Sequence, residues 1–339
     1  MPRPLSAALL ALALATPAVA AEKLTIGTVG VVSDAPYFIA DAEGYFREEG
    51  LDVSFIRFDS AAKMIAPLGS GELDAGGGAT SAALFNAARR DVRIRIVGDK
   101  ARNAKGYGFQ ALMIRKDLLD EGRIKSIADL KGAKVAVSAK GNSEEFILSV
   151  ALAKGGLRPA DVDEVYLGFP QHPAAYANRA IDASITTEPT ISFIQKAGTA
   201  VRFLGVDEIY PDYQTSVTFF GADFIRDKAP VVPRLMRALI RGMRFYVDSL
   251  KDGRLAGPDA ERTIAILVQY GGVKDPAVYR AAIPCGLDPD GAVNMESLRA
   301  TWQFFKDSGQ IDGKITMDDV VDMHFAQEAV QSLGPYRPK

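Results

Sequence analysis

The sequence contains little of the chemistry on which most enzymes and metalloproteins depend. Among its 339 residues there are one cysteine, Cys285, and two histidines, His172 and His324. A single cysteine excludes an intramolecular disulfide, and Cys285 has no base nearby in the sequence. The histidines have no partner at ligand spacing, so we predict no metal site and no cofactor, and we expect His172 to lie at the surface. No nucleophile elbow is present, and we therefore predict no catalytic residue and no enzyme activity.

An excess of charge of either sign is also missing. The formal net charge is −2, and no basic tract or arginine–aromatic interleaving occurs. These features argue against nucleic acid as a partner. Hydrophobic residues make up 48% of the chain, which is enough for a real core. The length suits two domains, or one domain built of two lobes.

One long apolar run stands at the N-terminus, and it is too short to span a bilayer comfortably. It covers Leu5–Ala15, follows the basic Arg3 and precedes the small residues Ala18–Ala20. This order is typical of a secretory signal peptide, which we predict over residues 1–20, with cleavage after Ala20 or Ala21. The alternative is an uncleaved anchor. No cysteine follows the run for lipid attachment, so we expect an exported, soluble protein without a lipid anchor.

From Lys23 onwards, short β-rich runs alternate with helical patterns, and the alternation occurs twice. A strand-to-helix corner with the dipeptide Asp-Ala appears in both halves, at Asp74 and again 108 positions later (182 − 74) at Asp182. Alternating strands and helices favour a mostly parallel sheet with flanking helices. Two copies of one α/β lobe are the simplest explanation.

The order of the predicted elements also suggests where the lobes begin and end. We expect lobe one to comprise residues 22–112 and 217–335, and lobe two residues 113–216. Two β-rich runs, "YGFQALMI" and "TSVTFF", are expected to pass between the lobes as a two-strand hinge. The helical C-terminal segment is expected to pack on lobe one, with Trp302, Phe304 and Phe305 in its core.

Ligands in open parallel sheets bind beyond the carboxyl ends of the strands, where helix N-termini offer free N–H groups. We find six such corners: "VSDAPYF", "FDSAAK", "GGGATS", "SAKGNSEEF", "GFPQHPAAY" and "TTEPTI". Ser60 is a natural N-cap, and Asn142 with Glu145 resembles a capping box. Gly76–Gly78 allow either a close approach to a ligand or tight strand–helix packing. No arginine stands at these corners to clamp an anion.

Several of these stretches together resemble the substrate-binding proteins of ABC importers. The relevant stretches are "APYFIADAEGYFREEGLDVSF", "MIAPLGSGELDAG", "IADLKGAKVAVS" and "IDASITTEP". They are most similar to the branch that binds taurine, alkanesulfonates, nitrate and thiamine-pyrimidine precursors. The resemblance runs from about Lys23 to Gly221. It implies a two-lobed periplasmic binding protein fold of type II, which closes on a solute and delivers it to a permease and its ATPase.

The resemblance also implies which residues line the pocket and what the pocket holds. We expect a small organic anion such as a sulfonate or carboxylate, aromatic ones included; the alternative is a pyrimidine or similar heterocycle with N–H donors. Glu188 would repel an anion if it faced the cleft. The predicted ligand-binding residues are Tyr37, Phe38, Ser60, Ala61, Gly78, Ala79, Thr80, Ser81, Tyr107, Phe109, Lys140, Gly141, Asn142, Ser143, Gln171, Glu188 and Pro189.

Two other functions remain open on the same fold. Some relatives of this branch are enzymes, which have a cysteine-rich motif and an essential histidine and lack export signals. A detached sensor domain would have the same sequence features as a transporter subunit. We predict a monomeric binding protein.

Overall fold

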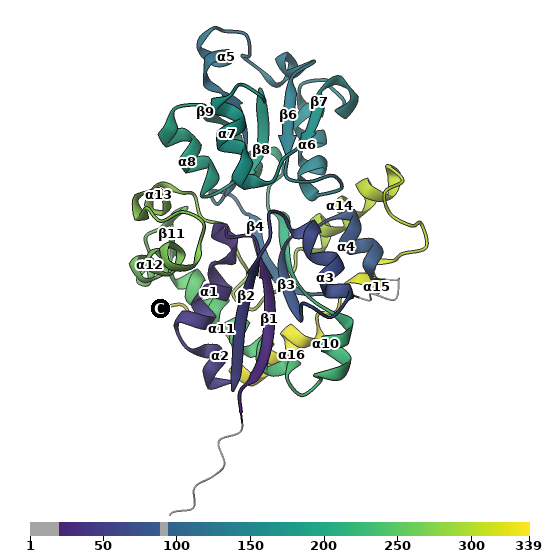
Figure 1. Cartoon of the computed structure of the whole chain (residues 1–339), viewed down its shortest axis with the longest axis vertical. Helices are drawn as coiled ribbons and strands as arrows, with labels where there is room; N and C mark the ends of the chain where they lie inside the picture. The colour runs from purple at the N-terminus through teal and green to yellow at the C-terminus, as the bar shows by residue number, and fades with distance from the viewer. Residues whose placement is uncertain (1–19, 89–93) are drawn as a thin grey trace, which may run out of the picture.

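The computed structural model describes residues 20–88 and 94–339. Apart from Ala20, the predicted signal peptide lies outside the described residues. Two five-stranded sheets lie one above the other, and helices flank each of them (Figure 1). We call the part around the first sheet lobe one and the part around the second sheet lobe two.

Both sheets are parallel except for one strand each. In lobe one, β10 runs antiparallel to β3 and β4, and in lobe two, β5 runs antiparallel to β8 and β9. The predicted two-lobed α/β fold with mostly parallel sheets is therefore confirmed. In spatial order, the strands of lobe one are β2 (Leu51–Arg57), β1 (Glu22–Thr28), β3 (Ala75–Ala79), β10 (Tyr213–Phe220) and β4 (Arg95–Asn103); those of lobe two are β7 (Asp163–Tyr166), β6 (Lys134–Val137), β8 (Ala183–Thr187), β5 (Gln110–Arg115) and β9 (Ala200–Gly205).

Helices follow most of the strands, and a helical segment completes lobe one. A short hairpin of β11 (Leu250–Lys251) and β12 (Arg254–Leu255) interrupts that segment. The helices before it are α1 (Ala35–Ala42), α2 (Tyr45–Glu48), α3 (Ile65–Gly69), α4 (Ala82–Ala87), α5 (Lys116–Asp120), α6 (Ser143–Lys154), α7 (His172–Ala177), α8 (Thr190–Ala197), α9 (Val206–Ile209), α10 (Ala222–Asp227) and α11 (Val232–Asp248); those after it are α12 (Ala260–Tyr270), α13 (Pro276–Ala281), α14 (Met295–Asp307), α15 (Met317–Val320) and α16 (His324–Leu333).

The C-terminal helices pack on lobe one, but one of them also reaches lobe two. Helices α11 and α16 join α1 in a core cluster of lobe one. On α14, Phe305 is fully buried, whereas Trp302 and Phe304 are half-buried. The Phe304 ring lies 5.5 Å from the ring of Phe146 on α6, so this side chain packs between the lobes rather than inside lobe one.

The chain passes between the lobes twice, at residues 104–109 and 210–212, since α9 before the second link packs in the core of lobe two. Strands β5 and β10, which we expected to act as the hinge, each belong to one sheet, so the two links and not the strands span the lobes. The predicted lobe boundaries at residues 113 and 217 fall inside these strands and stay a proposal.

Strand β3 has the sequence AGGGA because its neighbours leave no room for side chains. A Cβ on Gly77 would lie 2.2 Å from the Tyr37 hydroxyl, and a Cβ on Gly76 would lie 2.7 Å from the Phe219 ring. Real Cβ atoms do not approach so closely. These two glycines therefore serve tight packing, which was one of the two readings of their sequence.

Candidate functional site

The two sheets point the carboxyl ends of most of their strands at one another, and a small cavity lies between them. Side chains from both lobes line this inner cavity, whose volume is about 20 Å³. That is room for about one water molecule. The lining residues are Val29, Val31, Ser33, Ala61, Gly78, Ala79, Phe109, Gln110, Asn142, Glu144, Phe169, Thr187 and Ser216.

A larger pocket of about 210 Å³ adjoins the inner cavity and opens to solvent; we call it the outer pocket. It shares Val29, Val31 and Phe169 with the inner cavity, so the two spaces lie side by side. Most of its wall is apolar. The remaining lining residues are Gly30, Arg57, Pro170, Pro173, Pro189, Thr190, Phe193, Gly272 and Val273.

Arg57 is a residue of this region that the sequence analysis missed. It is the last residue of β2 and lies one position before the corner "FDSAAK", so it stands at the carboxyl end of a strand. Its side chain is exposed and forms no ion pair with any described residue. The statement that no arginine stands at a corner was therefore too narrow, and the signal would have been the strand end itself.

The first corner of lobe one already holds a carboxylate of the chain. Asp34 Oδ2 accepts hydrogen bonds from the backbone N–H groups of Val29, Gly30 and Val31, at 3.1, 2.6 and 3.1 Å. Its Oδ1 lies 2.8 Å from the buried ammonium of Lys100. Successive N–H groups of this kind form an anion-binding nest. Asp34 fills the nest, so this corner is not open to an anionic ligand.

The corner between β3 and α4 in lobe one and the corner between β6 and α6 in lobe two are bonded directly to each other. Ser143 N, at the start of α6, donates to the carbonyl of Thr80 at 2.9 Å, and Ala82 N, at the start of α4, donates to the carbonyl of Gly141 at 2.8 Å. Ser81 Oγ accepts from Leu84 N and caps α4. The N–H groups that we expected to face a ligand thus hold the two lobes together.

A hydrogen-bonded chain on lobe two fixes the polar wall of the inner cavity. Asn142 Nδ2 donates to Ser138 Oγ at 2.7 Å, and Ser138 Oγ donates to Glu144 Oε2 at 2.9 Å. The other oxygens, Asn142 Oδ1 and Glu144 Oε1, are buried without a partner among the described residues. The predicted capping box is wrong, because Asn142 bonds Ser138 rather than its own helix, while Glu145 Oε1 accepts from Gly141 N.

Glu188 acts as a cap of α8 and a contact between the lobes. Its carboxylate accepts from Ser192 N at 3.0 Å, from Ser192 Oγ at 3.1 Å and, across the cleft, from Ile283 N at 3.3 Å. Burial raises the pKa of Glu188, and these hydrogen bonds lower it in part. Glu188 lines neither the inner cavity nor the outer pocket, whereas its neighbour Pro189 lines the outer pocket.

Apart from Glu188 and Pro189, the predicted ligand-binding residues fall into three groups in the structure. Ala61, Gly78, Ala79, Phe109 and Asn142 line the inner cavity. Ser60, Thr80, Ser81, Gly141 and Ser143 are buried in the corners around it.

The third group lies elsewhere. Tyr37 and Phe38 are core residues: Tyr37 bonds Thr218 at 2.7 Å, and Phe38 stacks on Tyr270. The exposed Gln171 accepts from Gly168 N and closes a helix start. Tyr107 is half-buried in the link 104–109, and Lys140 is exposed.

Two groups that often act in enzyme catalysis, the His172 imidazole and the Cys285 thiol, lie in the interior. His172 is fully buried, which corrects the expected surface position, because its Nε2 bonds the carbonyl of Leu167 at 2.8 Å. Burial lowers its pKa to about 4. Burial also raises the pKa of the Cys285 thiol to about 12, so the thiolate that a nucleophile needs is disfavoured.

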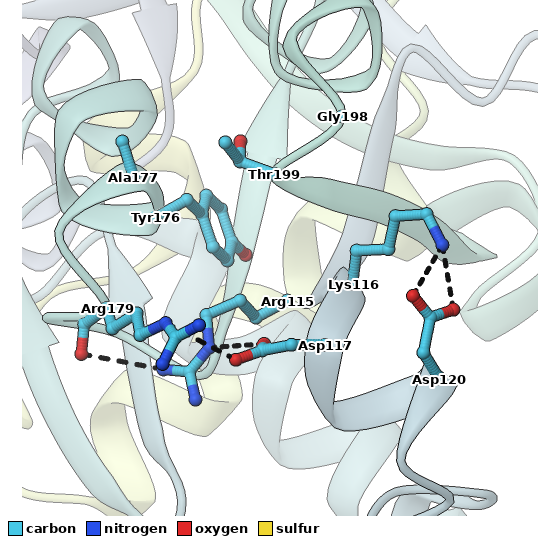
Figure 2. Close-up of a pocket in the computed structure, with 9 residues that line it drawn as sticks. All are labelled: Arg115, Lys116, Asp117, Asp120, Tyr176, Ala177, Arg179, Gly198 and Thr199. Carbon is cyan, nitrogen blue, oxygen red and sulfur yellow. Dashed lines mark hydrogen bonds and ion pairs between the residues drawn. The ribbon is translucent and has the colours of Figure 1, made fainter.

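A further pocket, of about 310 Å³, lies in lobe two away from the inner cavity (Figure 2). Its charges neutralise each other: Arg115 lies 2.7 Å from Asp117, and Lys116 lies 2.6 Å from Asp120. The side chains in Figure 2 point at these partners. Because its cations are already paired and lobe one contributes nothing to it, this pocket is a weaker candidate for a binding site than the inner cavity.

No group of His, Cys, Asp or Glu side chains suited to a metal ion occurs within residues 20–88 and 94–339. None of the helices in these ranges is long and apolar enough to cross a membrane.

Comparison with known proteins places the chain in a family. Residues 32–249, more than half of the chain, match the family model described as NMT1/THI5 like. The chain belongs to the NMT1/THI5-like family. This agrees with the resemblance found in the sequence, which runs from about Lys23 to Gly221.

Two relatives illustrate the range of similarity. A binding protein of Brucella abortus is 27% identical over 235 residues, covering 68% of this chain and 66% of the relative, slightly less than two thirds of its length. The taurine-binding periplasmic protein of Escherichia coli is 27% identical over 309 residues, covering 88% of this chain and 91% of that protein.

Solved structures share the fold. The alkanesulfonate-binding protein SsuA from Xanthomonas axonopodis pv. citri, bound to MOPS, has a TM-score of 0.71 and 20% identity over 90% of this chain and 100% of that chain. The desulfurization enzyme DSZB also matches, with a TM-score of 0.64 and 17% identity over 92% of this chain and 100% of that chain. The fold therefore occurs in binding proteins and in at least one enzyme.

Proposed function

We propose that this protein is the extracytoplasmic solute-binding component of an ABC importer. It captures a small organic solute between its lobes and delivers the solute to a permease and its ATPase. The inner cavity, lined from both lobes, is the observation on which this proposal rests. Its place at the carboxyl ends of the strands is where ligands of such sheets bind. Family membership supports the same reading.

Binding requires the lobes to move. A cavity of about 20 Å³ is far smaller than the roughly 300 Å³ or more of typical ligand pockets. The direct bonds from Ser143 N to Thr80 O and from Ala82 N to Gly141 O mark a closed arrangement. Opening about the links 104–109 and 210–212 would break these bonds and admit a solute, and closing would bury it.

The solute that we propose is a small sulfonate or carboxylate, aromatic ones included. The similarity to a taurine-binding protein and to an alkanesulfonate-binding protein supports an organic acid. So does the unpaired Arg57 in the apolar outer pocket, since a guanidinium can form a bidentate pair with an acid group. A heterocycle with N–H donors is the second candidate, because Glu144 lines the inner cavity.

An enzyme on this fold is the rival function. Neither the buried Cys285 nor the buried His172 lines the inner cavity or the outer pocket. We therefore propose binding rather than catalysis. We also propose export to the periplasm as a monomer without a lipid anchor.

A thermal-shift screen of the mature protein tests this function. The screen compares sulfonates, carboxylates, nitrate and pyrimidines. A solute at a hundredfold excess over its Kd stabilises the native state by about 2.7 kcal/mol, which raises the midpoint of unfolding. We expect a shift with organic acids. Turnover of a shifting solute would instead favour the enzyme, and the absence of any shift would contradict the proposed solute classes.

A further inference from the structure

The wall of the inner cavity has an unusual charge pattern. Of its lining residues, Glu144 is the one with an acidic or basic side chain. Glu144 is 2% exposed, and no salt bridge to it is present among the described residues. A buried carboxylate without a cation is costly unless a partner with N–H groups comes to it.

The hydrogen-bond directions on this wall leave acceptor atoms that need a donor. Asn142 Nδ2 is used by Ser138, and the Ser138 hydroxyl hydrogen is used by Glu144 Oε2. This order leaves Asn142 Oδ1 and Glu144 Oε1 as two acceptors without partners in the described structure. An amide oxygen and a carboxylate oxygen together suit a group with more than one N–H.

The backbone N–H groups and the lysine that could hold an anion near the inner cavity are already bonded within the protein. Asp34 takes the N–H groups of Val29–Val31 and pairs with Lys100. Thr80 O and Gly141 O take the first N–H groups of α6 and α4. An acid group placed here would meet the Glu144 carboxylate, and the donors left without a partner are uncharged hydroxyls such as that of Thr187, whereas the outer pocket offers the charged Arg57.

We propose that Glu144 and Asn142 determine specificity by accepting N–H groups from the buried end of the solute, whose acid group lies outward beside Arg57. The solute class is therefore an amino-substituted organic acid. This inference rests on the proposed function and names the chemistry of the same site.

Matched pairs of solutes test the inference by calorimetric titration at pH 8. The pairs are 4-aminobenzenesulfonate with benzenesulfonate, and taurine with ethanesulfonate. Glu144→Gln turns the free acceptor toward an amide N–H, which opposes the amine of the solute. The control is Glu164→Gln, which alters another partly buried acid of lobe two that lines neither the inner cavity nor the outer pocket.

We expect the amino member of at least one pair to bind about tenfold or more tightly than its partner, as for a hydrogen bond to a charged group. Glu144→Gln should remove that preference and Glu164→Gln should keep it, with unfolding midpoints checked for both. Equal binding within every pair, or an unchanged preference in Glu144→Gln, overturns the inference while the binding function stands. If no member of either pair binds, the proposed sulfonate class and the inference fail together.

Discussion

Glu144 is a residue whose ionisation should affect stability as well as binding. The pKa of Glu144 is raised from 4.5 to about 7, and burial is the main cause. The neighbouring Glu145 also raises this pKa, while the Ser138 hydrogen bond lowers it. Between these two pH values the folded protein holds a proton that the unfolded chain has lost. The free energy of unfolding therefore falls as pH rises from 4.5 to 7, by about 3 kcal/mol from this residue.

Urea unfolding of wild type and Glu144→Gln at pH 5 and pH 8 measures this effect. Glu144→Gln cannot ionise at this position, so its free energy of unfolding should not show this fall. Relative to wild type, the variant should therefore be about 3 kcal/mol more stable at pH 8 than at pH 5. A constant difference between the two proteins at both pH values would show that Glu144 ionises normally.

His172 should affect the acid side of the stability profile with the opposite sign. Burial lowers its pKa from 6.5 to about 4, while the Leu167 hydrogen bond opposes this shift. The unfolded chain binds a proton in this interval that the folded protein does not, so stability is lost as pH falls from 6.5 toward 4. The loss from this residue is about 3 kcal/mol.

His172→Gln retains a donor that can reach the carbonyl of Leu167 but cannot gain a charge. We expect its unfolding free energy to depend less on pH between 4 and 6.5 than that of wild type, as measured by urea titration. A parallel dependence in both proteins would mean that the imidazole charges without unfolding.

Single residues were the least predictable level from the sequence. Asn142 and Glu145 have the spacing of a capping box, yet the Asn142 side chain bonds Ser138, which follows the last residue of β6. His172 precedes Pro173 at a helix start, a pattern that we expected at the surface, but its Nε2 bonds the carbonyl of Leu167, directly after β7. In each case the deciding partner lies only four or five residues earlier in the chain, and its position depends on the path of the strand-to-helix turn, which the residue pattern does not specify.

At the scale of elements, the sequence predicted the positions of the strand-to-helix corners but not their contacts with each other. The sequence located the starts of α4, α6 and α8, because strand runs, glycines and caps mark them locally. It could not show that α4 and α6 bond to each other across the cleft, because this depends on how two distant lobes close. Arg57 was missed for a related reason, since its importance comes from the pocket and not from its neighbours in the chain.

The N–H group at the start of α4 offers a direct test of closure. Ala82→Pro removes the donor to Gly141 O, and proline is tolerated at the first position of a helix. The preceding Ser81 is already extended, as a residue before proline must be. We expect solute affinity to fall by about three- to tenfold, the effect of one lost hydrogen bond, with the fold retained.

Ala222→Pro is the matched control. Ala222 is the first residue of α10, follows the extended Gly221, and lines neither the inner cavity nor the outer pocket. Titration of both variants with a solute identified by the screen gives the comparison. Equal affinity in Ala82→Pro and wild type would contradict a role of this bond in the bound state.

For the whole molecule, the architecture was predictable because β-rich runs and helical patterns alternate along most of the sequence. The two-lobed arrangement follows from the repetition of that pattern, and the structure confirms it. The size of the cavity and the pairing of its polar groups follow from the way the lobes meet. No local pattern encodes them.

The crossing of the chain has a consequence for biosynthesis. In lobe one, β10 lies between β3 and β4, yet more than 100 residues separate it from β4 along the chain. All of lobe two lies in this interval, so an emerging chain can complete the second sheet before the first. Until residues 213–220 arrive, β4 has no neighbouring strand in its sheet. The order of synthesis therefore leaves the first sheet incomplete until late, which is compatible with the proposed export of the chain in an unfolded state.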